Sequence, residues 1–153
     1  MVLSIAQNRR GYKGNGFSFG GNTCIIERKG SGPMLQSTLC YLERGDEYLM
    51  LHRVKKENDC NHDKWIGVGG KFEDGESPEE CVLRETLEET GLTLTDYRYR
   101  GIVTFVSDRW ETEYMHLFTA TGWTGRIRED CDEGVLGWIH RDRLAALPQW
   151  AGD

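Results

Sequence analysis

The segment from Gly70 to Leu92 constrains this chain more than any other, because it joins a glycine-containing turn to a short, heavily acidic helix. Ser77 is a favourable N-cap residue, Pro78 suits the first helical position, and Gly91 can end the helix in a left-handed conformation. Glu80 can complete a capping box with the N-cap serine. These local signals predict one well-delimited helix directly after the turn.

Three glutamates, Glu85, Glu88 and Glu89, lie at i, i+3 and i+4 and are therefore neighbours on one face of that helix. Like charges at this spacing repel by roughly a few tenths of a kcal/mol per pair, a cost that a bound cation would remove. Hard oxygen ligands of this kind suit Mg²⁺ or Mn²⁺. A merely solvated acidic face is the alternative, and the preceding Gly69-Gly70 turn argues against it. The less polar side, which should pack on a sheet, consists of Val82, Leu83, Thr86 and Leu87.

This segment resembles the Nudix box, Gly-x5-Glu-x7-Arg-Glu-U-x-Glu-Glu-x-Gly-U, in which U is a bulky apolar residue. The single departure is Thr86, which keeps a branched shape and leaves the chemistry unchanged. The resemblance implies an α/β (α+β) fold in which a mixed β-sheet is sandwiched between helices. The matching positions are Gly70, Glu76, Arg84, Glu85, Glu88, Glu89, Gly91 and Leu92.

The rest of the chain is mostly rich in strand-forming residues, which agrees with that fold. A turn at Arg44-Gly45-Asp46 is expected to join the first two strands as a hairpin, and residues 55–64 read as a polar loop. A second helix is expected over 141–147, ended by Pro148. The expected strands are 36–42, 47–53, 65–68, 97–107, 113–121 and 135–139.

Residues 1–33 differ in composition from the rest of the chain and are expected to be a flexible, basic, glycine-rich extension. They are expected to be either a tether to nucleic acid or membrane or, as we favour, a non-native extension or mis-assigned start, with Met34 as the true initiator. The domain is then 34–153. The net charge of −6 argues against a general nucleic-acid binder. The extension contains five basic residues and one acid, namely Arg9, Arg10, Lys13, Arg28, Lys29 and Glu27.

The five cysteines are odd in number and include no CxxC pair, so a disulfide framework is not expected. No stretch is long enough to cross a membrane, and residues 1–33 lack the apolar run of a secretory signal. We therefore expect a reducing, cytoplasmic compartment and neither a membrane partner nor a stable nucleic-acid partner. The chain is expected to be a monomer or a homodimer.

The resemblance implies Mg²⁺-dependent cleavage of a phosphoanhydride, with Mn²⁺ as a possible substitute. It assigns the metal to Glu85, Glu88 and Glu89, with the Gly69 carbonyl as a further ligand and Glu133 as an additional acid from a loop outside the box. The general base that activates water is Glu85 or Glu88, and the sequence leaves both open. Arg84 is expected to pair with Glu76 and hold the loop against the helix, while Gly70 and Gly91 are structural positions of the box.

Residues 35–153 are also similar to the MutT-type 8-oxo-dGTP diphosphatase subgroup. That similarity implies that Trp150 stacks on an oxidised purine, that Asp153 binds its edge, and that Arg53 meets the substrate phosphate. Two departures stand out. Ile66 occupies a position where a relative places a base-contacting Asn. The chain stops at Asp153, where relatives continue, so we expect either a C-terminally truncated domain or an unusually open base pocket.

The expected function is therefore hydrolysis of a nucleoside triphosphate, with 8-oxo-dGTP as the leading substrate, to the monophosphate and pyrophosphate. Such an activity would serve nucleotide-pool sanitisation. The alternatives are a Nudix pyrophosphatase for ADP-ribose or dinucleoside polyphosphates, a Nudix-like nucleotide-binding domain without turnover, and a nucleic-acid-binding protein that acts through its basic arm.

Overall fold

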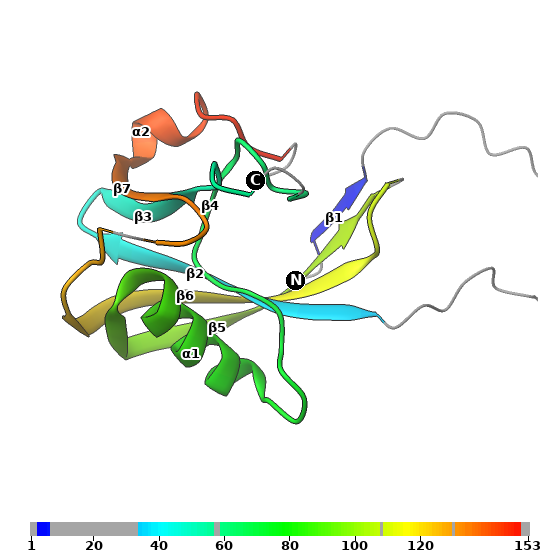
Figure 1. The fold of residues 1–153 in the computed structure, drawn as a ribbon, viewed down its shortest axis with the longest axis horizontal. Helices are drawn as coiled ribbons and strands as arrows, with labels where there is room; N and C mark the ends of the chain where they lie inside the picture. The colour runs from blue at the N-terminus through cyan, green and yellow to red at the C-terminus, as the bar shows by residue number, and fades with distance from the viewer. Residues whose placement is uncertain (1–2, 7–33, 57–58, 108, 130, 151–153) are drawn as a thin grey trace, which may run out of the picture.

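A computed structural model describes residues 3–6, 34–56, 59–107, 109–129 and 131–150. Seven strands form one sheet, in the order β1-β5-β6-β2-β3-β4, with β7 also paired to β3 (Figure 1). Helix α1 lies across the sheet, and the short helix α2 follows β7 (Figure 1). The elements are β1 Leu3–Ala6, β2 Leu35–Arg44, β3 Glu47–His52, β4 Trp65–Ile66, α1 Pro78–Thr90, β5 Leu92–Val106, β6 Glu113–Gly125, β7 Val135–His140 and α2 Arg141–Leu144.

The sheet mixes parallel and antiparallel pairs, which confirms the expected fold class. Strands β2 and β3 form the predicted hairpin, with Gly45 at a φ of 61° in its turn. Strand β2 is parallel to β6, and β5 is antiparallel to β6. Strand β5 is longer than predicted and begins at Leu92, directly after the helix cap, because its pairing with β6 continues to Gly125.

Helix α1 begins and ends where its local signals predict. Ser77 and Glu80 form a reciprocal capping box, and Gly91 ends the helix at a φ of 75°. Val82 and Thr86 are fully buried against the sheet, as expected from their spacing. Leu87 was expected on the same buried side but is 48% exposed, so that prediction is wrong. The buried stripe turns away from it toward Glu89 and Thr90, whose side chains are buried instead.

The core lies between α1 and the central strands. Trp123 and Trp138 stack on its border, with ring centroids 5.6 Å apart. Because both long strands β2 and β6 contribute alternate side chains to this core, their other faces are free to line a site. The buried cluster consists of Cys40, Leu42, Leu49, Val68, Val82, Leu92, Leu94, Phe118 and Ala120.

The N-terminal segment departs from expectation at one place. No strand was expected in residues 1–33, yet Leu3–Ala6 forms β1, which is parallel to β5 from Val103 to Val106. Residues 1–2 and 7–33 lie outside the described part of the chain. Helix α2 is shorter than predicted, since it ends at Leu144 before Pro148 is reached. In the described residues, no helix is both long enough and apolar enough to span a membrane.

Candidate active site

The two glycines before α1 allow the turn to approach the helix glutamates closely. Gly69, at a φ of 144°, donates its N–H to Oε2 of Glu89 at 2.9 Å. A Cβ on Gly70 would lie 2.5 Å from the Glu85 carboxyl carbon, so no side chain fits there without displacing that carboxylate. The turn therefore lies close to two carboxylates of α1, those of Glu85 and Glu89.

Glu89 is an acid held in a dry environment. Glu89 is only 7% exposed, and this burial raises the pKa of its carboxyl group to about 7. The hydrogen bond from the Gly69 N–H opposes that rise. The nearby negative charge of Glu85 raises the same pKa further. A buried carboxylate of this kind is stabilised when a cation supplies the charge that water does not.

Arg84 holds the loop before α1 against the helix. Its Nε and Nη2 donate to the two carboxylate oxygens of Glu76 at 2.7 and 2.9 Å, which is the predicted pairing. Its Nη1 also donates to Glu85 at 2.8 Å and to Glu88 at 3.1 Å. The guanidinium lowers the pKa of Glu76 to about 2. Arg84 thus neutralises part of the acidic face in the conformation described.

Arg53 likewise neutralises acidic side chains, on the other side of the site. Its Nε donates to Oδ2 of Asp59 at 2.7 Å, and its Nη1 pairs with Glu133 and lies 3.8 Å from Oε1 of Glu89. Lys56 Nζ also contacts Glu133, at 2.6 Å. Arg53 was expected to meet substrate phosphate. In this structure its guanidinium lies among carboxylates from three separate segments of the chain, namely Asp59, Glu89 and Glu133.

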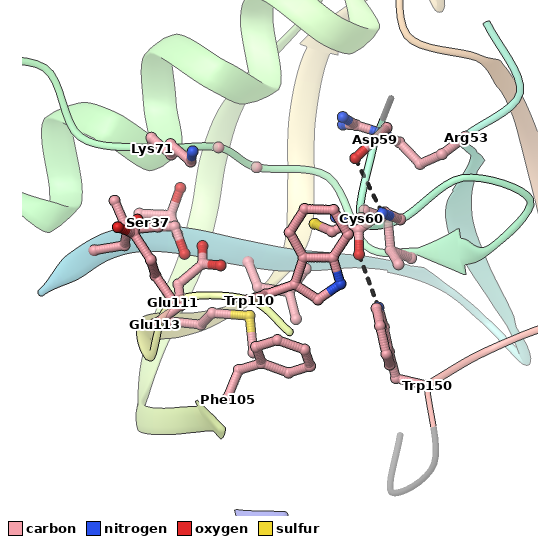
Figure 2. Close-up of a pocket in the computed structure, with 18 of the residues that line it drawn as sticks. Ser37, Arg53, Asp59, Cys60, Lys71, Phe105, Trp110, Glu111, Glu113 and Trp150 are labelled. Atoms are coloured by element: carbon pink, nitrogen blue, oxygen red, sulfur yellow. Dashed lines mark hydrogen bonds and ion pairs between the residues drawn. The ribbon is translucent and has the colours of Figure 1, made fainter. Parts of the chain in front are cut away.

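A cavity of about 670 Å³ opens beside these groups. Arg53, Glu85 and Glu133 line one part of it, and aromatic side chains line another. Figure 2 shows Phe105, Trp110 and Trp150 around the same space. Glu88 is not among the lining residues, and its side chain is 59% exposed. Of the two candidates for the general base, Glu85 therefore lines the cavity and Glu88 does not.

Trp150 is positioned at the cavity wall by contacts with other segments. Its Nε1 donates to Oδ1 of Asn61 at 2.8 Å, and its ring meets that of Phe105 edge-on, with centroids 5.0 Å apart. Lys64 Nζ lies 4.6 Å from the indole ring centroid. Ile66 also lines the cavity, so an apolar side chain occupies the position at which a relative is expected to place a base-contacting Asn. Asp153 lies outside the described residues.

Comparison with known proteins decides the family. A model of the NUDIX domain matches residues 34–153. The chain belongs to the Nudix family. The match covers the whole of the domain expected from the sequence, from Met34 to the last residue.

Individual relatives of this Nudix hydrolase point in the same direction. The uncharacterized Nudix hydrolase YvcI of Bacillus subtilis is 32% identical over 120 residues, which is 76% of this chain and 72% of that protein. An oxidized purine nucleoside triphosphate hydrolase of Danio rerio is 38% identical over 92 residues, or 59% of this chain and 58% of that protein. A MutT protein structure from Bacillus halodurans superimposes with a TM-score of 0.66 at 31% identity, covering 78% and 77% of the two chains.

Nudix hydrolases use divalent metal ions, and the donors of this chain suit such an ion chemically. Glu85, Glu89 and Glu133 supply hard oxygen atoms, and a bound cation would offset the cost that burial imposes on the ionised form of Glu89. Within the described ranges, no group of three or more acidic, His or Cys side chains is spaced to hold a metal. In the same region, Arg84 pairs with Glu85, and Arg53 lies 3.8 Å from Glu89.

Several cavity residues were not anticipated from the sequence. They come from β2, the loop before β4, the turn before α1, the end of β5, the β5–β6 connection and the start of β6. Little in their local pattern marks a site. One signal was available, because residues 113 and 115 alternate within an expected strand and therefore share one side of it. The unanticipated residues include Ser37, Lys56, Asp59, Cys60, Asn61, Lys71, Phe105, Trp110, Glu111, Glu113 and Met115.

Proposed function

We propose that this Nudix hydrolase cleaves nucleoside triphosphates to the monophosphate and pyrophosphate, with 8-oxo-dGTP as the leading substrate and Mg²⁺ as the metal. The observation that carries the proposal is the single cavity that joins acidic and basic groups to an aromatic wall. A nucleotide has the same two parts, a charged phosphate chain and a flat base. The similarity to an oxidized purine nucleoside triphosphate hydrolase of Danio rerio supports the choice of substrate.

The metal would be held by Glu85, Glu89 and Glu133, with Glu88 and the Gly69 carbonyl as the further ligands implied by the box. When bound, a divalent ion neutralises phosphate charge and polarises the bond to be broken. The glycine turn contributes by keeping Glu85 and Glu89 at fixed positions beside it. Mn²⁺ offers the same preference for oxygen ligands and is the natural alternative ion.

Glu85 is our candidate for the residue that accepts the proton of the attacking water. It lines the cavity, whereas Glu88 projects toward solvent. The water oxygen forms a bond to phosphorus, the bridging oxygen leaves with its electron pair, and Glu85 takes the released proton. Arg84, whose donors already contact Glu85, orients that carboxylate without itself touching the substrate.

Charge on the phosphates would be met by cations of the cavity. Arg53, Lys56 and Lys71 all line it. In the conformation described, Arg53 and Lys56 pair with Glu133, so substrate phosphate and Glu133 would compete for them. A metal bound to Glu133 would favour the phosphate in that competition, because it withdraws negative charge from the carboxylate.

The proposal is tested with the full chain and a panel of 8-oxo-dGTP, dGTP, dATP, ADP-ribose and a dinucleoside polyphosphate, each with and without Mg²⁺. We expect metal-dependent release of pyrophosphate, with the highest kcat/KM for 8-oxo-dGTP. Release of AMP from ADP-ribose or a dinucleotide at a higher kcat/KM would instead establish the alternative pyrophosphatase. Stoichiometric binding without any product would establish the non-catalytic alternative.

A further inference from the structure

One side of the cavity is formed by the sheet itself, and it carries a carboxylate in an unusual place. Residues 35, 37, 39 and 41 of β2 and residues 113 and 115 of β6 all line the cavity, as alternation along two paired strands requires. Glu113 is level with Leu35 on one neighbouring strand and with Phe105 on the other. An acid therefore stands between two apolar side chains on a surface where aliphatic and aromatic residues prevail.

Glu113 has no hydrogen-bond or ion-pair partner among the residues that the structure describes, although basic groups line the same cavity. An ionised carboxylate only accepts hydrogen bonds, and it offers up to four acceptor positions. Figure 2 shows its side chain beside those of Ser37 and Glu111, on the cavity side of the sheet. Its acceptors are thus available to a ligand that brings N–H donors into the cavity.

A second unsatisfied polar group adjoins it. Ser37 is 3% exposed, and its Oγ is buried with no hydrogen-bond partner among the described residues. Ser37 is level with Met115, so it is the diagonal neighbour of Glu113 on the same face. A buried hydroxyl without a hydrogen-bond partner destabilises the folded protein, and a ligand atom that accepts a hydrogen bond from it removes that cost.

We propose that Glu113 and Ser37 recognise the Watson–Crick edge of a guanine-type base. This inference rests on the proposed function, since it concerns the nucleotide of the same cavity. Guanine presents, side by side, a carbonyl oxygen, one ring N–H and an exocyclic amino group. The Ser37 hydroxyl donates to the carbonyl, and the Glu113 carboxylate accepts from the ring N–H and the amino group. Adenine presents a ring nitrogen lone pair toward the carboxylate, so it is disfavoured.

The aromatic side chains of the cavity can hold a base in the orientation that this proposal requires. Trp110 and Trp150 come from different loops, and both face the cavity that Phe105 borders (Figure 2). A base held flat by such rings presents its edge, rather than its face, to the side chains of the sheet. Oxidised and unoxidised guanine share the Watson–Crick edge. Glu113 therefore separates guanine from adenine and leaves the choice between the two guanines to other contacts.

The test measures binding of dGMP, dIMP and dAMP to the full chain in Mg²⁺ by isothermal titration calorimetry. Glu113→Gln keeps the shape of the side chain but gives an amide that can donate to adenine. We expect the ratio of dGMP to dAMP affinity to fall by roughly tenfold or more, as the loss of a charge-assisted hydrogen bond implies. The matched control is Glu111→Gln, which removes the same charge two residues away and should preserve the ratio.

Ser37→Ala gives an independent signature. It should weaken dGMP and dIMP equally, because both carry the carbonyl, and should leave their ratio unchanged. An unchanged dGMP-to-dAMP ratio in Glu113→Gln, or an equal fall in Glu111→Gln, would overturn the inference, as would the absence of any dGMP preference in the unsubstituted chain. Binding is read separately from turnover. Correct ratios without pyrophosphate release would refute the proposed function alone, and pyrophosphate release with unaltered ratios would refute the inference alone.

Discussion

The two parts of the cavity are held in place to different degrees. At the acidic part, the lining residues Glu85 and Glu133 and the adjoining buried Glu89 are each fixed by a guanidinium group, a lysine or a backbone N–H. At the aromatic part, Trp110 is 47% exposed and Glu113 has no described partner. Bond cleavage needs atoms that are positioned beforehand, whereas base selection tolerates side chains that adjust to the ligand. We therefore expect substitutions at the first part to lower the rate and substitutions at the second to change selectivity.

The largest effect is expected from Glu89→Gln, which keeps the shape of a buried ligand but removes its charge. Turnover should fall by roughly 10²-fold or more, equivalent to about 2.7 kcal/mol of transition-state stabilisation. The melting temperature should not fall, because burial already disfavours the ionised form of this group. Steady-state kinetics at saturating Mg²⁺ and a thermal melt measure both, with Glu129→Gln, at an exposed position outside the site, as control. Near-full activity in Glu89→Gln would refute the metal assignment.

Gly70→Ala tests whether pre-positioning matters without changing any charge. The new methyl group would overlap the Glu85 carboxyl, so this side chain must move while the backbone stays in place. We expect kcat to fall by roughly tenfold or more, because small displacements of reacting groups are costly. Gly137→Ala is the control, since its Cβ would meet its nearest neighbour at an ordinary 3.4 Å. Equal kinetics in the two variants would show that the close approach is unimportant.

Trp150→Ala addresses the aromatic part. Loss of a stacking surface should cost roughly 1–3 kcal/mol in binding, and neither phosphate nor metal is touched. Discrimination between 8-oxo-dGTP and dGTP should weaken more than kcat at saturation. Measuring kcat and KM for both nucleotides separates the two effects, and Trp150→Phe should retain most of the discrimination. A large fall in kcat with unchanged selectivity would contradict the assignment of base selection, rather than rate, to the aromatic part of the cavity.

Glu76→Gln probes the support of the acidic part through its dependence on pH. The folded-state pKa of Glu76, about 2, lies below its ordinary value, so its contribution to stability is present near neutrality and is lost as pH falls from about 4.5 toward 2. The contribution should be about 1 kcal/mol once solvent screening is included. Urea unfolding at several pH values should show a flatter acid limb in Glu76→Gln. Parallel acid limbs in the two proteins would contradict the assignment.

Deletion of residues 1–33 should have the smallest effect. It removes the four-residue strand β1 from the edge of β5 and leaves every described cavity residue in place. We expect kcat/KM to change by less than roughly a factor of two and the melting temperature to fall only slightly. Comparison of the chain that starts at Met34 with the full chain provides the measurement. A large loss of activity would show that the extension is part of the domain.

The helix and its acidic face could be predicted because their determinants are local. Ser77 and Gly91 fix the helix ends within a few residues of sequence, and the pairing of Arg84 with Glu76 follows from the turn between them. The strand cores could be predicted in the same way. Their ends could not, because β5 continues for as long as β6 offers it partners.

The aromatic part of the cavity could not be predicted, because distant segments create it. Glu113 becomes a neighbour of Leu35 only through the parallel pairing of β2 with β6. Asn61 meets Trp150 across 89 residues of sequence. The exposure of Leu87 was misjudged because the helix turns its buried stripe toward Glu89, and burying a glutamate is not something that hydrophobic periodicity reveals.

The contacts around Arg53 extend further than the acidic part of the cavity. Arg53 lies against Glu89 and binds Asp59, the Asp59 carboxylate accepts the N–H of Asn61, and the Asn61 side chain accepts the indole N–H of Trp150. Charge added at Glu89 is thus connected to an aromatic chromophore by consecutive polar contacts. Because indole emission responds to its hydrogen bonding and to nearby charge, we expect the fluorescence of Trp150 to change when a divalent cation is added, before any nucleotide is present.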